Sequence, residues 1–209
     1  MSTAQTDHLL STTRAVRRRL DLQRPVERSA ILECLQLAIQ APTASNMQSW
    51  RWLVIDDPDI RADVAELFAS GTAPRIERRR EHTNDPQTRR IYDSALYLTT
   101  ILSRVPVLIV PCVDGRLDGP RALDPAVFYG SIFPAIWSLQ LALRSRGLGS
   151  VMTTPFLGDQ EALYMKVLRI PPAVTPIALL PVAYTIGDEF KPAKRPPVET
   201  VTWWNRWSE

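Results

Sequence analysis

The sequence predicts a single α+β domain, and three observations support this prediction. Its 209 residues suit one domain with extensions, and a hydrophobic fraction of 45% is enough for a sizeable core. Helical and strand-like apolar patterns are mixed along the chain with few clean strand–helix–strand units, which disfavours a Rossmann fold. The glycine fingerprints of dinucleotide-binding loops and P-loops, and the serine elbow of hydrolases, are missing from the sequence.

The first half of the chain predicts four helices and two strands. Apolar residues at helical spacing predict helices over 7–13, with Asp7 as N-cap, and over 27–40, 59–69 and 88–103. Apolar runs rich in β-branched residues predict strands over 50–56 and 105–113. Residues 70–87 are polar and charged and contain Gly71, Pro74 and Pro86, so we expect little structure there and a possible mobile lid.

The second half begins with a long apolar helix over 125–146. We expect it to be nearly all buried, at the centre of the fold or at a subunit interface, and to be kinked by Pro134. Gly147 and Gly149 end it. The remaining patterns predict a strand over 150–154, a helix over 160–168, a strand over 177–184 and a proline- and tryptophan-rich tail.

Composition and charge exclude several classes of protein. A net charge of +3 does not provide the broad basic face of a nucleic-acid-binding protein. The longest apolar stretch, 122–143, is interrupted by Asp124, Pro125 and Pro134, so we expect no membrane span, and with no signal peptide we expect a cytoplasmic protein. Cys34 and Cys112 are interpreted as small core residues, with a reactive thiol or a disulfide as the alternative.

Four separated segments are richer in polar, glycine and basic residues than folding alone requires. They are Thr-Arg-Ala-Val-Arg at 13–17, Ala-Pro-Thr-Ala-Ser-Asn-Met-Gln-Ser-Trp at 41–50, Gly-Leu-Gly-Ser-Val-Met-Thr-Thr at 147–154 and Lys-Pro-Ala-Lys-Arg-Pro at 191–196. Their order, spacing and helix–strand context resemble the nitroreductase family of FMN-dependent NAD(P)H oxidoreductases over nearly the whole chain. The segment 42–50 carries the most specific part of this resemblance.

The resemblance implies a nitroreductase-like fold, with a central mixed or antiparallel sheet flanked by helices, in an intertwined homodimer. It implies that the FMN phosphate is bound by arginines, because guanidinium groups pair well with phosphate. The matched candidates for the phosphate are Arg14, Arg17 and Arg195, and Ala15 and Lys194 beside them are also expected to be cofactor-binding residues. Ala15 departs from the usual serine, which removes one hydroxyl contact. The alternative for the first cluster is a solvated cationic helix end.

The flavin ring is expected to contact two of these segments. Ser45, Asn46 and Gln48 lie in the loop that offers hydrogen bonds to the pyrimidine edge, and donors there stabilise the reduced anionic ring. An ordinary asparagine-containing turn is the alternative. Gly149, Thr153 and Thr154 are expected to lie near flavin N5 and O4, where Pro155 cannot donate an N–H.

The resemblance also implies a reaction and a set of partners. NADH or NADPH reduces FMN, which then reduces a nitroaromatic, a quinone or an activated alkene by a ping-pong mechanism, so no catalytic side chain is assigned. Two flavin sites are shared across the homodimer, and the arm 187–209 is expected to wrap the partner, its own subunit being the alternative. Two other functions stay open: a flavin-storage protein with little turnover, and a specialised relative such as an azoline dehydrogenase, a dehalogenase or a flavin-fragmenting enzyme.

Overall fold

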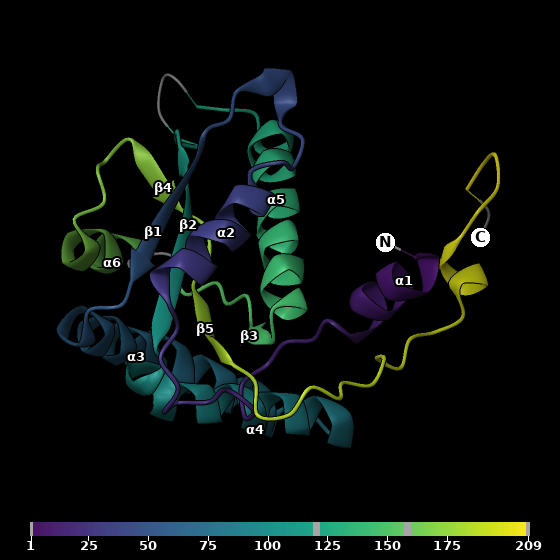
Figure 1. Ribbon diagram of the computed structural model, residues 1–209, viewed down its shortest axis with the longest axis horizontal. Coiled ribbons are helices and arrows are strands. Elements are labelled where there is room, and N and C mark those ends of the chain that lie inside the picture. The colour runs from purple at the N-terminus through teal and green to yellow at the C-terminus, as the bar shows by residue number, and fades with distance from the viewer. Residues whose placement is uncertain (1, 119–121, 157–159, 208–209) are drawn as a thin grey trace.

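A computed structural model of the chain describes residues 2–118, 122–156 and 160–207 (Figure 1). The strands are β1 (Trp50–Ile55), β2 (Val107–Asp114), β3 (Leu148–Ser150), β4 (Val174–Pro176) and β5 (Leu180–Tyr184). They form one antiparallel sheet in the order β1-β2-β5-β3, and β4 pairs with β2. The predicted α+β class and the predicted antiparallel sheet are confirmed.

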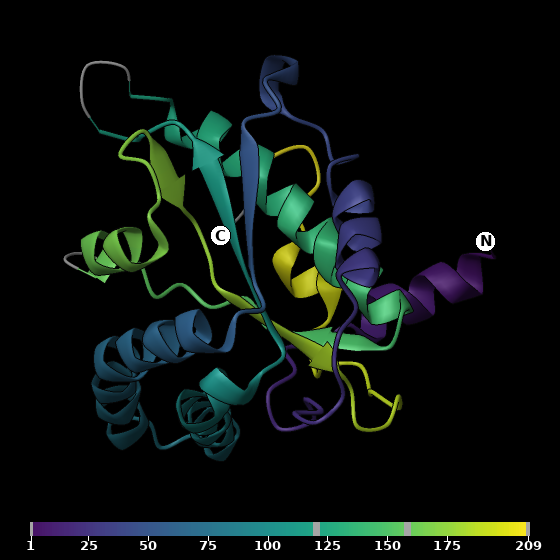
Figure 2. The same ribbon diagram turned by 60° about the vertical axis from the view of Figure 1, so that its left-hand side comes forward.

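Helices cover both faces of this sheet (Figure 2). They are α1 (Thr3–Thr12), α2 (Arg28–Ala38), α3 (Pro58–Glu81), α4 (Pro86–Ile101), α5 (Pro125–Ser145) and α6 (Gln160–Leu168), with 3-10 turns η1 (Ala44–Asn46), η2 (Leu102–Arg104) and η3 (Val198–Val201). α2 and α5 pack on one face, and α3, α4 and α6 pack on the other.

Strand β2 lies between these two layers and contributes to both cores. Leu108 and Val110 join the cluster under α3 and α4, whereas Val107 and Ile109 join the cluster under α2 and α5. Side chains alternate across a strand, so a strand that is apolar at every position is buried on both faces. The predicted buried strand over 105–113 is therefore confirmed.

The prediction of an unstructured lid over 70–87 is wrong for most of that segment. Helix α3 continues through Gly71 and Pro74 to Glu81, and α4 starts at Pro86. Local propensity disfavours this helix, but tertiary packing against α4 and α6 compensates. Gly71 makes the packing possible, because a Cβ there would lie 2.5 Å from Oε1 of Gln160.

Two other helices differ from their predicted form. α1 starts at Thr3 instead of residue 7, because Ser2 and Gln5 form a capping box that the sequence reading missed. α5 is buried along one side only, where it packs on α2 and the sheet. Its other side exposes Tyr129, Phe133 and Trp137. Among the described residues, α5 is the one helix long and apolar enough to span a membrane, and half of its apolar window is buried in the protein.

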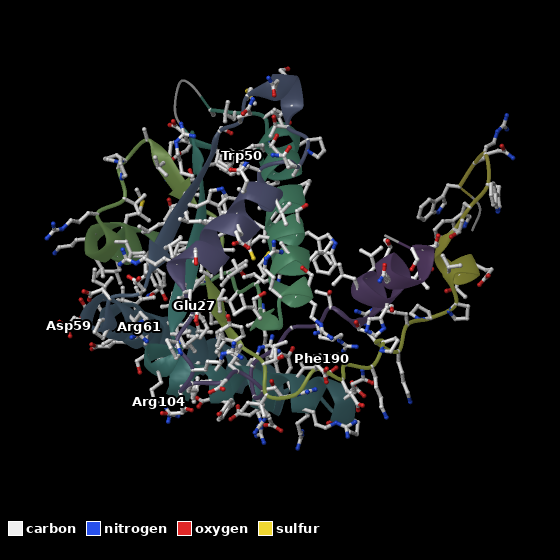
Figure 3. The ribbon with its side chains drawn as sticks, in the orientation of Figure 1. Glu27, Trp50, Asp59, Arg61, Arg104 and Phe190 are labelled. Atoms are coloured by element: carbon white, nitrogen blue, oxygen red, sulfur yellow. The ribbon has the colours of Figure 1, made fainter. Side chains whose placement is uncertain are left out.

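The C-terminal arm departs from the body. Phe190 marks its base (Figure 3), and the guanidinium carbons of Arg19 and Arg144 lie 4.2 and 4.7 Å from the centroid of its ring. Beyond this point, the arm runs away from the sheet on the same side as α1 (Figure 1). Of the predicted arm 187–209, residues 208 and 209 lie outside the described residues.

Candidate functional site

The Arg14–Arg17 turn packs directly on strand β3. The Val16 N–H donates to the Ser150 carbonyl at 2.9 Å, and Ala15 forms a parallel bridge with Ser150. Gly149 allows this close approach, because a Cβ there would lie 3.0 Å from the Val16 Cβ. The structure thus brings two of the four predicted segments together, and Gly149 serves their packing.

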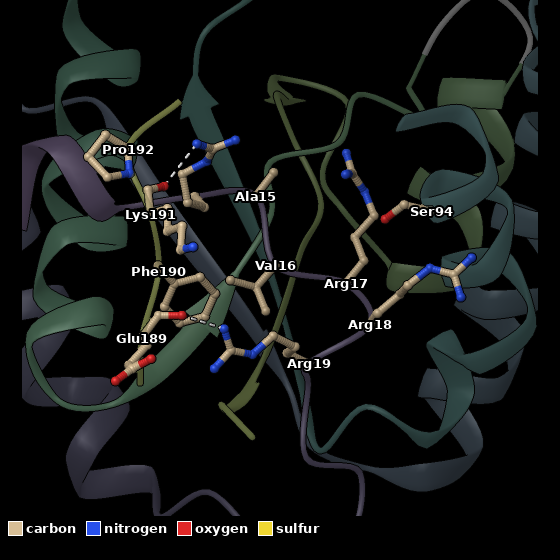
Figure 4. Close-up of a pocket in the computed structure, with 11 residues that line it drawn as sticks. Ala15, Val16, Arg17, Arg18, Arg19, Ser94, Glu189, Phe190, Lys191 and Pro192 are labelled. Atoms are coloured by element: carbon tan, nitrogen blue, oxygen red, sulfur yellow. Dashed lines mark hydrogen bonds between the residues drawn. The ribbon is translucent and has the colours of Figure 1, made fainter. Parts of the chain in front are cut away.

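This turn lines an open, cation-rich cavity of about 460 Å³, here called the turn pocket (Figure 4). Its basic residues come from the turn and from the base of the arm: Arg14, Arg17, Arg18, Arg19 and Lys191. Nη1 of Arg14 donates to the Lys191 carbonyl at 3.2 Å, and Nη1 of Arg19 donates to the Glu189 carbonyl at 2.6 Å. These backbone contacts leave the positive charges unneutralised, so the pocket suits an anion.

Arg17 lies between the turn pocket and a second cavity. Figure 4 shows its side chain pointing away from Glu189 and toward Ser94. Its Nε is buried and has no hydrogen-bond partner among the described residues. Burial lowers the pKa of the Arg17 guanidinium, because desolvation disfavours its charged form. A buried cation without an acceptor is costly, and an anionic or carbonyl-bearing ligand would relieve that cost.

The second cavity, here called the α3–α4 pocket, measures about 320 Å³. Helices α3 and α4 provide its walls, and Thr153 and Thr154 lie at its edge. Arg75, Arg79 and Tyr92 also line it. The sequence analysis missed Arg75 and Arg79 because it expected no helix over most of residues 70–87, although their spacing of four residues is a helical signal. It predicted the helix that carries Tyr92 but had no sign that this side chain borders a cavity.

The structure separates the roles of the two threonines. The Thr153 hydroxyl donates to the Leu179 carbonyl at 2.8 Å, and its N–H donates to the same carbonyl at 3.0 Å. Thr154 is exposed, and neither its N–H nor its hydroxyl has a hydrogen-bond partner among the described residues. Thr153 therefore anchors the segment, and Thr154 is the one with groups available for a ligand.

The predicted ring-binding loop around η1 has an unusual backbone. Ser45, Asn46 and Gln48 have φ values of 50°, 54° and 48°, in the left-handed region that side chains other than glycine rarely adopt. Nε2 of Gln48 donates to Oδ1 of Asn46 at 2.8 Å, and all three residues are exposed. Such strain is typical of binding and active sites.

Within one chain, the predicted site residues lie in three separate regions. Arg14, Ala15, Arg17, Thr153 and Thr154 border the two pockets, with Gly149 beneath them. The η1 loop lies at the opposite end of the molecule from the Arg14–Arg17 turn, as both ribbon views show (Figures 1 and 2). Lys194 and Arg195 are exposed on the arm, and Lys191 takes their expected place beside Arg14. A single chain therefore does not assemble the whole predicted site.

The structure also shows the surroundings of the two cysteines. Cys34 and Cys112 are both buried and free, which confirms that they are core residues. Burial raises the pKa of the Cys112 thiol to about 12, so it is unreactive at neutral pH. No cluster of metal-ligating side chains is present in the described ranges.

Comparison with known proteins identifies the class to which this fold and site belong. The sequence profile of the nitroreductase family matches residues 10–184. The chain is 28% identical over 194 residues to the NADH dehydrogenase of Thermus thermophilus, covering 86% of this chain and 87% of that protein.

Two solved structures are also similar. A putative NADH dehydrogenase/NAD(P)H nitroreductase from Bacteroides thetaiotaomicron has a TM-score of 0.70 at 20% identity, covering 99% of this chain and 100% of that one. Oxidised iodotyrosine deiodinase bound to FMN and 3-iodo-L-tyrosine has a TM-score of 0.69 at 22% identity, covering 93% and 96%. The chain belongs to the nitroreductase family, which confirms the resemblance seen in the sequence, and its relatives are oxidoreductases.

Proposed function

We propose that this protein is a homodimeric, FMN-dependent oxidoreductase that takes electrons from NADH or NADPH and passes them to a small organic acceptor. The observation that carries this proposal is the arginine turn. Arg17 keeps a buried, unpartnered Nε between two cavities, and Arg14 and Lys191 add positive charge on one side. This arrangement of charges does not stabilise the fold, but it suits a ligand that has an anionic end and a ring that accepts hydrogen bonds.

The residues present fit FMN. The turn pocket offers Arg14 and Lys191 to a phosphate, and the arm carries Lys194 and Arg195 close by in sequence. Arg17 would bridge from the phosphate end to the pyrimidine edge of the ring, and the free N–H of Thr154 would donate near flavin N5 and O4. FMN, when bound, supplies the hydride- and electron-accepting ring, and the protein supplies orientation and charge.

A second copy of the chain would complete the site. The η1 loop carries the amides of Asn46 and Gln48, yet it lies far from the arginine turn of its own chain (Figure 1). In a homodimer, the loop of one protomer can reach the pockets of the other. The exposed apolar stripe Tyr129, Phe133 and Trp137 on α5 and the exposed tryptophans of the arm provide surface for such an interface.

The chain's own residues would have three tasks in the reaction. Arg17, together with the amides of the η1 loop, would stabilise negative charge on the pyrimidine edge during reduction. Thr154 would fix the ring near N5 and O4. The α3–α4 pocket beside the ring would admit the nicotinamide end of the reductant and then the acceptor, in a ping-pong order, with acceptors such as nitroaromatics, quinones or activated alkenes.

Reductive dehalogenation is the second candidate, because iodotyrosine deiodinase shares the fold over most of the chain. It uses the same flavin site and differs in the acceptor. Release of halide from a halogenated phenol by the reduced protein would favour it, whereas reduction of a nitroaromatic or quinone without halide release favours the first candidate.

The visible spectrum of the purified protein provides the first test, and a bound flavin chromophore is expected. The cofactor released by denaturation should co-elute with FMN on a calibrated column, and finding FAD, haem or no cofactor after reconstitution would refute the proposal. Anaerobic titration with NADH and with NADPH, followed by an oxidant, then separates an enzyme from a storage protein. A flavin that is not reduced within minutes by either nucleotide would favour storage.

A further inference from the structure

The α3–α4 pocket has a charge pattern that flavin binding at the turn does not explain. Arg75 and Arg79 line it from α3, and no carboxylate is among its described lining residues. Neither arginine forms an ion pair within the described parts of the chain, whereas the neighbouring Arg80 is paired with Asp93. Two uncompensated cations therefore face the same cavity.

Helix stability does not account for this pair. Like charges four residues apart on a helix repel one another and destabilise it. The last turn of α3 contains Arg78, Arg79 and Arg80, where the helix dipole favours cations, but Arg75 lies a turn earlier and lacks that stabilisation. An anion held between Arg75 and Arg79 would replace the repulsion with two charge-assisted contacts.

The rest of the pocket indicates what kind of anion fits. Phe68 and Leu98 are buried at its floor, and Ile76 and Tyr92 add apolar and aromatic wall. The Thr72 hydroxyl, on a residue only 7% exposed, has no hydrogen-bond partner among the described residues. A volume of about 320 Å³ is at the small end for ligand sites, which favours a single ring over a dinucleotide.

We propose that Arg75 and Arg79 form a specificity site for the carboxylate of a small aromatic acceptor, whose ring lies on the apolar floor of the α3–α4 pocket. This inference rests on the proposed function, because the pocket ends at Thr153 and Thr154, where the flavin edge is placed. The carboxylate at the arginines directs the reactive end of the ring toward that edge. Neutral acceptors of the same shape lose this contact.

The test compares 4-nitrobenzoate with 4-nitrobenzamide, which differ little except in charge. Calorimetry on the oxidised protein as purified should show at least tenfold tighter binding of the carboxylate. R75Q and R79Q should each reduce that preference several-fold, leaving nitrobenzamide affinity unchanged. R78Q is the matched control, because Arg78 is on the same helix but does not line the pocket, and it should retain the full preference.

Several results would overturn the assignment. The first is equal affinity for the two ligands in the wild-type protein. The second is that R78Q loses as much of the preference for 4-nitrobenzoate as R75Q and R79Q do. The third is loss of flavin from R75Q or R79Q, since that would make these arginines cofactor ligands. Weaker binding of NADH or NADPH without weaker binding of nitrobenzoate would assign them to the reductant instead. Flavin content is measured on the same samples, so a protein without flavin that still prefers nitrobenzoate refutes the proposed function but not this site.

Discussion

Removing the end of the C-terminal arm should weaken dimerisation and flavin binding together. Trp204 and Trp207 are 85% and 78% exposed in the single chain, and Trp207 stacks on Trp203 with ring centroids 3.8 Å apart. Exposed indoles at this density are unfavourable in water, so they are expected to pack on a partner subunit. The test is truncation of the chain after Pro197.

The size of the effect follows from the exposed area. Fully burying a large apolar side chain contributes about 1.5–3 kcal/mol. Weighted by the exposed fractions of Trp204 and Trp207, burial of the two indoles contributes about 2.5–5 kcal/mol per arm. Each dimer loses two arms, so the summed loss is about 5–10 kcal/mol, and the dimer dissociation constant should rise by about three and a half to seven orders of magnitude.

Sedimentation velocity over a range of protein concentrations measures this shift, and absorbance of the same samples gives the FMN occupancy. Among the described residues after Pro197, none is buried, so the truncated body should keep its fold and its thermal unfolding midpoint at high concentration. Leu163→Ser is the control, because Leu163 is exposed on α6, away from the arm (Figure 1). A truncated protein that stays dimeric with full flavin would show that the arm packs on its own subunit.

Three further outcomes are expected. Arg14→Ala or Arg195→Ala should weaken FMN binding by about 1.5–3 kcal/mol, the scale of a charged hydrogen bond, and leave riboflavin nearly unaffected in fluorescence titration; equal losses would indicate a folding role. Thr153→Val should lower the free energy of unfolding in urea by about 1 kcal/mol, because its hydroxyl donates to a backbone carbonyl. Thr154→Val should leave both stability and the flavin spectrum unchanged, because it keeps the backbone N–H proposed to contact the ring. Because the pKa of the Cys112 thiol is raised in the folded protein, the thiol ionises first in the unfolded chain, so the free energy of unfolding should fall above about pH 9 by at most about 1.4 kcal/mol per pH unit. Cys112→Val should reduce this fall, and an unchanged dependence of the free energy of unfolding on pH would contradict the reasoning.

Local sequence patterns were sufficient to predict most of the helices and strands and to indicate the family. A short apolar run rich in β-branched residues suits a strand buried on both faces, which is why β2 was predictable. The loop 42–50 was recognisable because its residue types serve a ligand more than a fold. Helix periodicity also located α2 and α6 within a few residues.

Contacts between segments far apart in the sequence decided the full length of α3 and which candidate site residues lie together. Gly71 and Pro74 argue locally against a helix, yet α3 continues, and it packs against α4 and α6. That continuation places Arg75 and Arg79 on one wall of a pocket, which composition alone could not show. In the same way, the approach of the Arg14–Arg17 turn to Gly149 and the distance between the turn and the η1 loop depend on the path of the whole chain. The sequence determined which residues could bind a flavin, whereas the tertiary structure decided which of them meet in one chain, because side-chain proximity depends on packing between elements far apart in sequence.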